Sequence, residues 1–341
     1  MRRRLLDLLA SPCCRNVMEA DCEWSGDEAA IGHLICKFCR QRYPVIDGVP
    51  RLLPPVELAP GVAQTRESFA WEWLRHPGPR PDEDRAIFLE ETQIPAADWR
   101  GKLALDAGCG MGRYSLAAAG LGAEVVAFDL SEAALRLKAA AKESDKLHVV
   151  MGDINHPPFR RGIFDVVFSL GVLHHAADTQ TAFRRVAELV RDRGLLTFWV
   201  YGKAGRLDDF RTNPLREGRR WVARHRALAW LVVALRHALS DVLRLFTVRL
   251  PVRLNYALCF PVAVLGAVPL VKYLTPSVHP DFRVRLIEDF DWLSPVYQHH
   301  HSKEELRLWL QEAGFTVLKV LPHGLVPKPG MLARKTDHVR N

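Results

Sequence analysis

The chain has 341 residues with 48% hydrophobic and 25% charged side chains, which is the composition of a soluble globular protein with room for more than one domain. Its net charge is +8, and the segment Arg206 to Arg253, with eleven Arg against four acids, holds nearly all of this excess. The chain has seven Cys, mostly in one N-terminal cluster, which do not match the disulfide framework of a secreted protein. The first apolar run is interrupted by Asp7 and is too short for a signal peptide. We therefore expect a cytoplasmic protein.

Residues 1–55 are expected to form a small domain that contains most of the cysteines. Cys36 and Cys39 make a C-x-x-C knuckle, which Cys13 and Cys14 precede and the stretch YPVIDGVPRLLP follows. The pattern resembles the short zinc-ribbon domain that occurs as a methyltransferase partner protein and is also found fused to bacterial methyltransferases. In that family the first knuckle is usually C-P-x-C, whereas this chain has Ser11 at the first ligand position.

The resemblance implies a zinc site in this domain. A tetrahedral site takes four nitrogen or sulfur donors, and Cys14, Cys36 and Cys39 supply three of them. Cys13 or Cys22 has to supply the fourth, and we assign Cys13. The alternative is a metal-free ribbon that keeps its fold through its apolar residues.

Residues 56–100 are expected to be a Pro-rich linker followed by helices. A helix is predicted within Gln64 to Gly78, where the aromatic residues Phe69, Trp71 and Trp73 cluster. Fused methyltransferases of the type that the ribbon resembles carry a similar Q-T-x-E-S-F-x-x-E-W segment, which can close over the cofactor. An aromatic stripe usually belongs to a hydrophobic core, so we expect core packing first and cofactor contact second.

Residues 103–130, LALDAGCGMGRYSLAAAGLGAEVVAFDL, have the pattern strand, glycine turn, helix, strand. One acid ends each strand, Asp106 the first and Asp129 the second. Glycines let the backbone approach a ligand closely, and the start of a helix offers unpaired N–H groups. An acid at the end of the second strand suits the two ribose hydroxyls of a nucleoside.

The details of this turn distinguish two cofactors. A dinucleotide site uses G-x-G-x-x-G, and a carboxylate at Asp106 would repel its pyrophosphate. The spacing here is G-x-G-x-G, and the same carboxylate attracts the ammonium and sulfonium of S-adenosylmethionine. The stretch resembles the first two motifs of class I S-adenosylmethionine-dependent methyltransferases, whose D-x-G-C-G-x-G signature is matched here. The resemblance, together with the later strand ends, implies these cofactor-binding residues: Asp106, Gly108, Cys109, Gly110, Gly112, Arg113, Asp129, Leu130, Asp153, Ile154, Leu170 and Gly171.

Strand and helix patterns continue to alternate through residues 101–203. Ser131 is expected to cap a helix over Glu132 to Lys142. The further expected elements are strands over Leu147 to Asp153, Phe164 to Leu170 and Leu195 to Tyr201, a helix over Thr181 to Val190, and a turn over Arg191 to Gly194. Such alternation predicts an α/β fold with a doubly wound, Rossmann-like methyltransferase sheet, in which ligands bind at the carboxyl ends of the strands.

Several side chains are candidates for the catalytic role. Methyl transfer is a displacement in which positioning supplies much of the rate, and a base is needed only where the acceptor must lose a proton. His174 and His175 follow the fourth expected strand, and Tyr201 ends the fifth. His299 and His301 belong to a D-W-x-S-P-x-Y-Q-H-x-H segment that resembles one in the same fused methyltransferases; the alternative for them is a structural role before a helix.

Residues 204–289 form an insertion that is larger than the minimal fold needs. Apolar residues recur at helical spacing at Trp221, Leu228, Leu231, Val232, Leu235 and Leu239. The run Leu254 to Val271 is uncharged, but Asn255, Pro261, Gly266 and Pro269 interrupt it. We expect that the insertion forms a buried lid over the acceptor site. The second alternative is an interfacial helix pair with Arg facing anionic lipid, and the third is a membrane span. Nucleic acid is a weaker alternative partner, because Lys is scarce here and we recognise no binding motif.

Residues 290–341 are expected to return the chain to the sheet. Ser302 and Glu305 make a capping box for a helix over Lys303 to Ala313, and Gly314 ends it. Phe315 to Val320 then has the pattern of an antiparallel edge strand. The sequence therefore predicts an S-adenosylmethionine-dependent methyltransferase for a small-molecule or lipid-like acceptor. The alternatives are an RNA methyltransferase and a non-catalytic cofactor-binding module for protein interaction or a membrane surface.

Overall fold

A computed structural model describes residues 1–55, 58–75, 78–203, 225–269, 271–277, 279–321 and 328–337. Trp221 lies outside these ranges. The N-terminal domain consists of a short helix and an antiparallel meander: α1 (Arg3–Leu6), β1 (Met18–Ser25), β2 (Glu28–Cys36), β3 (Arg42–Ile46) and β4 (Val49–Leu52). The two residues between β3 and β4, Asp47 and Gly48, both have positive φ, as a tight type I′ hairpin turn requires.

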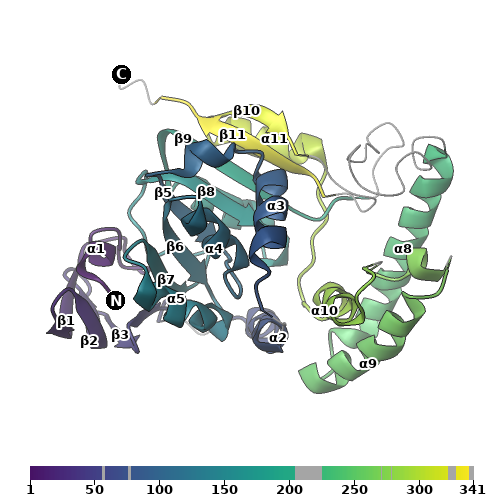
Figure 1. The fold of residues 1–341 in the computed structure, drawn as a ribbon, viewed down its shortest axis with the longest axis horizontal. Helices are drawn as coiled ribbons and strands as arrows, with labels where there is room; N and C mark the ends of the chain where they lie inside the picture. Colours follow the sequence, from purple (N-terminus) through teal and green to yellow (C-terminus); the bar gives the residue numbers. More distant parts are fainter. Residues whose placement is uncertain are drawn as a thin grey trace.

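The larger domain is an α/β sheet with the predicted architecture. Its strands are β5 (Leu103–Ala107), β6 (Glu124–Asp129), β7 (Leu147–Gly152), β8 (Phe164–Leu170), β9 (Val190–Trp199), β10 (Phe315–Val320) and β11 (Gly330–Lys335). Their order is β7-β6-β5-β8-β9-β11-β10; the first five are parallel, and β11 is antiparallel to both β9 and β10 (Figure 1). The doubly wound, Rossmann-like fold is therefore confirmed, and the antiparallel edge strand is β10.

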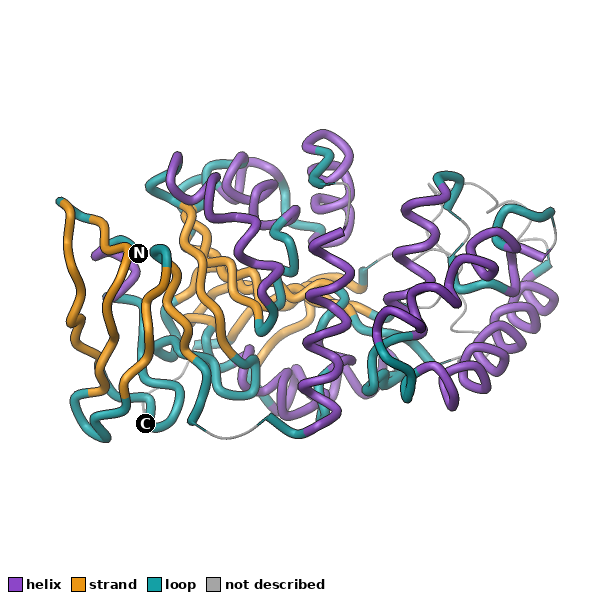
Figure 2. Tube along the Cα trace, turned by 90° about the horizontal axis from the view of Figure 1, so that it is seen from below, coloured by secondary structure: helices purple, strands orange, loops and turns teal. Residues whose placement is uncertain are grey.

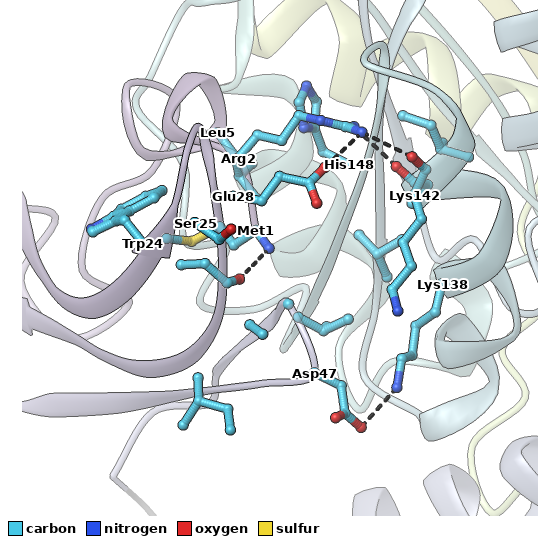
Figure 3. Close-up of a pocket in the computed structure, with 18 of the residues that line it drawn as sticks. Met1, Arg2, Leu5, Trp24, Ser25, Glu28, Asp47, Lys138, Lys142 and His148 are labelled. Atoms are coloured by element: carbon cyan, nitrogen blue, oxygen red, sulfur yellow. Dashed lines mark hydrogen bonds and ion pairs between the residues drawn. The ribbon is translucent and has the colours of Figure 1, made fainter.

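The two domains share one sheet. β4 pairs in parallel with β7 through Arg51 with Met151 and Leu52 with Gly152, so the meander extends the parallel sheet at its edge. A cavity of about 570 Å³ lies along this joint (Figure 3). Arg2 on one side donates to the carbonyl oxygen of Ala141 at 2.9 Å, and Asp47 pairs with Lys138 at 2.8 Å. These contacts tie the N-terminal domain to the body of the protein.

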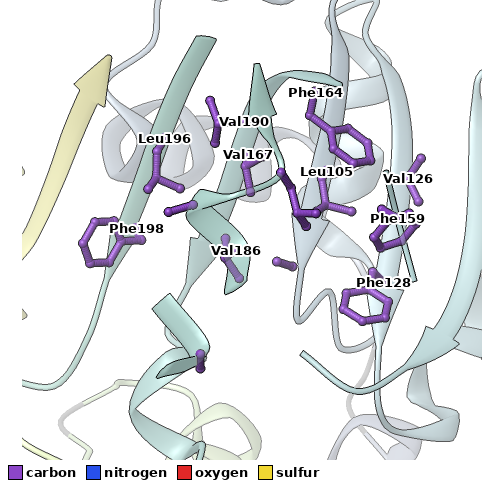
Figure 4. Close-up of a cluster of buried hydrophobic side chains, with 14 of the residues drawn as sticks. Leu105, Val126, Phe128, Phe159, Phe164, Val167, Val186, Val190, Leu196 and Phe198 are labelled. Atoms are coloured by element: carbon purple, nitrogen blue, oxygen red, sulfur yellow. The ribbon is translucent and has the colours of Figure 1, made fainter. Parts of the chain in front are cut away.

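Helices cover both faces of the sheet. The described helical elements of the body and its linker are α2 (Pro60–Arg75), α3 (Pro81–Thr92), η1 (Ala96–Trp99), α4 (Arg113–Gly120), η2 (Glu132–Leu137), α5 (Lys138–Glu143), η3 (Leu173–His175), α6 (Thr179–Ala187) and α11 (Lys303–Glu312). One core lies between the sheet, α6, α11 and the N-terminal domain, where Phe128, Phe159 and Phe164 are packed edge to face (Figure 4). The second core lies on the other face, against α3, α4 and η2.

Two expected elements differ in the structure. Ser131 precedes a 3₁₀ segment, η2, and its hydroxyl donates to Asp129 at 2.7 Å instead of capping a helix; the α-helix α5 begins only at Lys138. β9 begins at Val190, so the expected turn at Arg191 to Gly194 lies inside the strand, with Arg193 at a φ of 61°. Ser131 is drawn to the Asp129 carboxylate. Residues 191–194 form an irregularity between the pairs Phe164 with Val190 and Val166 with Leu195, which join them to β9.

The end of the chain forms as predicted. Ser302 accepts a hydrogen bond from the backbone N–H of Glu305 while the Glu305 carboxylate accepts one from the backbone of Ser302, which is a complete capping box. Gly314 follows α11 with a φ of 76°, and β10 has the predicted bounds.

The insertion contains three described α-helices, α8 (Arg226–Thr247), α9 (Val252–Leu265) and α10 (Phe282–Leu293), and a short η5 (Val271–Leu274). α8 and α9 lie at the end of the molecule away from the N-terminal domain, and α10 lies between them and the sheet (Figures 1 and 2). The uncharged run is not the buried lid that we expected, because Leu254, Leu258 and Val264 of α9 are exposed. Among the described residues, no helix is both long enough and apolar enough to cross a membrane.

Candidate functional site

The glycine turn between β5 and α4 depends on left-handed backbone. Gly110 has a φ of 52° and Gly112 a φ of 87°. A Cβ at Gly110 would lie 3.3 Å from the Trp73 ring, and one at Gly112 would overlap the side chain of Leu137. A side chain at either glycine would crowd its neighbours, so a ligand at the turn would meet backbone atoms there. α4 starts directly after the turn, where the first N–H groups of a helix have no partner within the helix.

Asp129, at the end of β6, is tied to this turn. One carboxylate oxygen accepts a hydrogen bond from the backbone N–H of Gly110 at 2.8 Å, and the other accepts from the backbone and hydroxyl of Ser131 at 2.7 Å. A carboxylate has roughly four lone-pair sites in all. Three of those of Asp129 are occupied, so it can accept a hydrogen bond from one ligand hydroxyl through the oxygen that also accepts from Gly110, while it holds the turn in place.

The turn and Asp129 line a cavity of about 470 Å³. It brings together many of the predicted site residues from four strand ends. Those that line it are Gly108, Cys109, Gly110, Arg113, Asp129, Leu170, Gly171, His175 and Tyr201. Strand carboxyl ends meet at this edge of a parallel sheet, which is why residues far apart in the sequence converge here.

The other predicted cofactor residues do not line this cavity. Asp106 is buried and its carboxylate accepts a hydrogen bond from the Ser115 hydroxyl at 2.6 Å; burial raises the pKa of Asp106 to about 7. Asp153 accepts hydrogen bonds from the backbone and side chain of Asn155. Gly112, Leu130 and Ile154 are likewise outside the cavity lining. Within the described residues, the direct electrostatic attraction that we expected from Asp106 is therefore replaced by a structural hydrogen bond to α4.

Helix α2 covers the glycine turn, with its polar side chains inward. Thr65, Ser68 and Glu72 are its buried residues, whereas Phe69 and Trp73 are half-buried and line the cavity. The expected core packing is found for Trp71, which packs against a hydrophobic cluster of the insertion, whereas Phe69 and Trp73 form the cavity wall. The sequence signal for this was present, because positions 65, 68 and 72 have helical spacing and lie on one face.

Helices α8 and α10 supply the far wall; the insertion was expected at the acceptor site, but none of its lining residues was predicted individually. Arg236 comes from α8, and Glu288, Asp291 and Trp292 come from α10. None of these positions belongs to a motif, and Asp291 was noted only as part of the segment before the histidines.

Four of the five cysteines of the N-terminal domain lie close together, and the Sγ atoms of Cys13, Cys14 and Cys39 all lie within 4.8 Å of one another. Cys13 Sγ lies 3.0 Å from Cys39 Sγ, and Cys14 Sγ lies 3.3 Å from Cys36 Sγ and 3.8 Å from Cys39 Sγ. Four sulfurs around one tetrahedral Zn²⁺ are separated by roughly 3.7 Å, given Zn–S bonds of about 2.3 Å. The donor set therefore fits zinc, with Cys13 as the fourth ligand, while Cys22 contacts the carbonyl of His33 instead.

Comparisons with known proteins agree with this division of the chain. Residues 105–198 match a methyltransferase domain model, and residues 2–48 match a Trm112p-like protein model. A UPF0434 protein from Coxiella burnetii is 43% identical over 54 residues, which are 16% of this chain and 84% of that relative. The chain therefore contains a methyltransferase domain and, before it, a Trm112p-like domain.

Longer relatives match the methyltransferase domain. A ubiquinone biosynthesis O-methyltransferase from Thiobacillus denitrificans is 35% identical over 114 residues, which are 33% of this chain and 46% of that relative. This chain therefore spans less than half the length of that enzyme. The crystal structure of a 1,6-didemethyltoxoflavin-N1-methyltransferase from Burkholderia thailandensis aligns over 91% of this chain and 100% of its own, at 17% identity and a TM-score of 0.45.

The methyl donor of this family fits the residues of the methyltransferase domain. Gly108 and Gly110 bring the backbone of the turn to the cavity lining, and Asp129 faces the cavity with acceptor capacity for a ribose hydroxyl. Trp73 lies against the same turn and would shield the bound donor from water.

The two histidines after β8 differ in access to the cavity. His175 lines it; its Nδ1 lies 3.0 Å from the carbonyl oxygen of Tyr297 and must carry the proton, which leaves Nε2 as the acceptor. His174 is fully buried, with its ring centroid 3.8 Å from that of Tyr201. Burial lowers the pKa of His175 to about 3, so this imidazole is neutral and a weak base near pH 7.

The remaining catalytic candidates also differ in whether they line the cavity. His299 and His301 do not line the cavity: the backbone N–H of His299 donates to the carbonyl of His174, and that of His301 donates to the carbonyl of Tyr201. The His301 ring packs against Trp309 at 4.8 Å. Tyr201 lines the cavity, and its hydroxyl donates to Asp291 at 3.0 Å. The backbone contacts favour the structural role for the two histidines.

Zinc binding by the Trm112p-like domain can be measured directly. We expect about one equivalent of zinc in purified protein, by elemental analysis, because the four thiols already lie at near-tetrahedral separations. Cys39→Ser is expected to reduce this zinc content strongly. Cys22→Ser is not expected to change it, because the Cys22 thiol is hydrogen-bonded to the carbonyl oxygen of His33. Less than about a tenth of an equivalent in the wild type would support the metal-free ribbon instead.

Proposed function

We propose that the protein transfers a methyl group from S-adenosylmethionine to a small-molecule or lipid-like acceptor. The observation that carries this proposal is the single cavity in which the glycine turn and Asp129 meet aromatic walls from α2 and α10. The donor supplies a methyl group activated by its sulfonium. Phe69, Trp73 and Trp292 provide an apolar enclosure that positions an acceptor beside it and excludes water.

The names of relatives support a small acceptor. Those most similar in the methyltransferase domain include a ubiquinone biosynthesis O-methyltransferase and a malonyl-[acyl-carrier protein] O-methyltransferase, the latter from Legionella pneumophila. We propose the same type of acceptor, a small molecule, for the present chain.

The outer surface of the insertion supports access from a lipid surface. α8 is amphipathic with its polar side buried, at Arg236, His237, Ser240 and Thr247. Its outer side and that of α9 expose large apolar residues, which we name the apolar face: Leu228, Leu231, Leu235, Leu239, Val242, Leu245, Phe246, Leu254, Leu258, Phe260, Val264 and Leu265. Arg249 and Arg253, exposed between the two helices, suit anionic headgroups. α8 also contributes Arg236 to the cavity, so the apolar face and the acceptor site share one helix.

Transfer of a labelled methyl group tests the proposed activity. Protein incubated with methyl-labelled S-adenosylmethionine and separate lipid, small-metabolite and RNA fractions of a bacterial extract is expected to label the lipid or metabolite fraction. Labelling of RNA alone, together with RNA binding that weakens as salt rises, would establish the alternative of an RNA methyltransferase. Donor binding without label in any fraction would instead support the non-catalytic module.

A further inference from the structure

The cavity contains a buried carboxylate that the glycine turn does not use. Glu72 of α2 is 1% exposed, and among the described residues no donor lies within hydrogen-bond distance of its Oε2. Its side chain lines the same cavity as Asp129 and neighbours Trp73, which lies against Gly110. A buried carboxylate without a partner is costly, so its presence at a ligand cavity indicates a partner that arrives with the ligand.

A second carboxylate faces the same space from α10. Asp291 accepts a hydrogen bond from the Tyr201 hydroxyl at 3.0 Å, which fixes its side chain at the cavity wall. Burial raises the pKa of Asp291 to about 6, and burial followed by the nearby Asp291 raises that of Glu72 well above its usual range. Both shifts arise first from burial, and Arg113, together with Lys328 at Asp291, offsets it only in part, so a further positive charge beside the pair would stabilise the ionised carboxylates.

The charge of the described cavity lining leads to the same conclusion. It includes five carboxylates, from Glu72, Glu91, Asp129, Glu288 and Asp291, and three cationic side chains, from Arg113, Arg236 and Lys328. S-adenosylmethionine carries a sulfonium, an ammonium and a carboxylate, and so adds one net positive charge. When all five carboxylates are ionised, one negative charge then remains without compensation, so ionisation of Glu72 in this largely buried space requires a further cation.

We infer that Glu72 and Asp291 form the acceptor subsite and that the acceptor carries a basic amine, which this pair binds as an ammonium. This inference rests on the proposed methyl transfer and names its acceptor class. The ring of Trp292 adds a surface on which a cation is stabilised, as the Arg236 guanidinium 5.6 Å from its centroid illustrates. A neutral hydroxyl acceptor would leave the excess negative charge in place.

The pair also provides the proton acceptor that amine methylation requires. The bound ammonium passes one proton to the Glu72 carboxylate, which frees the nitrogen lone pair. The nitrogen then forms the bond to the methyl carbon, and the carbon–sulfur bond breaks with its electron pair remaining on sulfur. The products are the methylated ammonium and S-adenosylhomocysteine, and the proton stays on Glu72 until it leaves to solvent.

A matched pair of probes tests this subsite by calorimetry. The full chain is first titrated with S-adenosylhomocysteine and, once saturated, with 2-phenylethylamine or with 2-phenylethanol, which has the same aromatic part and no charge. We expect the amine to bind about tenfold or more tightly than the alcohol, because only the amine compensates the buried carboxylates. Glu72→Gln is expected to abolish this preference. Glu67→Gln, at an exposed position of the same helix, is the control and is expected to retain it.

The outcomes separate the subsite from the proposed function. If the wild type does not bind S-adenosylhomocysteine, the proposed methyl transfer is wrong. If it does bind and the two probes then bind equally, or the amine preference survives in Glu72→Gln, the amine subsite is overturned. Asp291→Asn provides the second variant, should Glu72→Gln fail to show a wild-type thermal transition, and the same loss of preference is expected from it.

Discussion

Asp129→Ala is expected to weaken the binding of S-adenosylmethionine by about tenfold or more, since a hydrogen bond to a charged group contributes about 1.5–3 kcal/mol and a ribose hydroxyl loses this acceptor. The substitution also removes the acceptor for the Gly110 N–H, which holds the turn. Isothermal titration calorimetry with the methyl donor measures the effect. The loss is expected in affinity and not in stoichiometry, because the cavity itself remains.

Two further variants define what this result means. Asp129→Asn keeps an acceptor oxygen for Gly110 but loses the charge, so an intermediate loss of affinity is expected from it. Asp145→Ala removes an exposed carboxylate in the turn before β7 and is expected to bind like the wild type. Equal affinities of the wild type and Asp129→Ala would contradict the assignment of this cavity to the methyl donor.

The double substitution Leu231→Asp and Leu235→Asp is expected to abolish sedimentation with vesicles made of equal parts phosphatidylglycerol and phosphatidylcholine. Both leucines are about half exposed, one turn apart on α8, within the apolar face. Burial of a fully exposed leucine contributes about 1.5–3 kcal/mol, so the exposed half of each contributes about half as much, and the loss of both lowers the membrane partition constant by about tenfold or more. Vesicle co-sedimentation with the wild-type protein gives the reference.

An exposed leucine elsewhere supplies the matched control. Leu308 of α11 is exposed to a similar extent, and Leu308→Asp is expected to sediment as the wild type does. Light scattering during size-exclusion chromatography examines the competing occupant, a second copy of the chain. A stable wild-type dimer that the double substitution dissociates, together with wild-type protein left in the supernatant by vesicles, would show that the apolar face is a protein interface.

Local patterns in the sequence predict the cofactor half of the site well. The bounds of β8 and β10 follow from uninterrupted or alternating apolar residues, and the turn after β5 follows from glycine spacing, because each depends on the conformational preferences of a few neighbouring residues. Asp129 was placed correctly for the same reason: it ends a strand whose carboxyl end must lie at the ligand edge of the sheet.

Elements that depend on distant neighbours were predicted less well. The start of β9 is set by pairing with β8, and Asp106 turned inward because Ser115 on α4 offers it a hydrogen bond. Two of the three aromatic residues of α2 are not in the core because the side of this helix that packs inward carries Thr65, Ser68 and Glu72. No local propensity specifies which side of an isolated helix will be covered.

The sequence by itself determined the alternation of strands and helices in the methyltransferase body, the cysteine cluster and the glycine turn with Asp129. Each of these is encoded by short-range spacing, which the chain carries wherever it folds. Only the tertiary structure decided that Glu72 and Asp291 face one cavity, that His299 and His301 do not line it, and that α8 turns its apolar side outward. The reason is physical: these features depend on contacts between α2 and the helices of the insertion, which begin more than 150 residues further along the chain and meet α2 only when the insertion packs on the sheet.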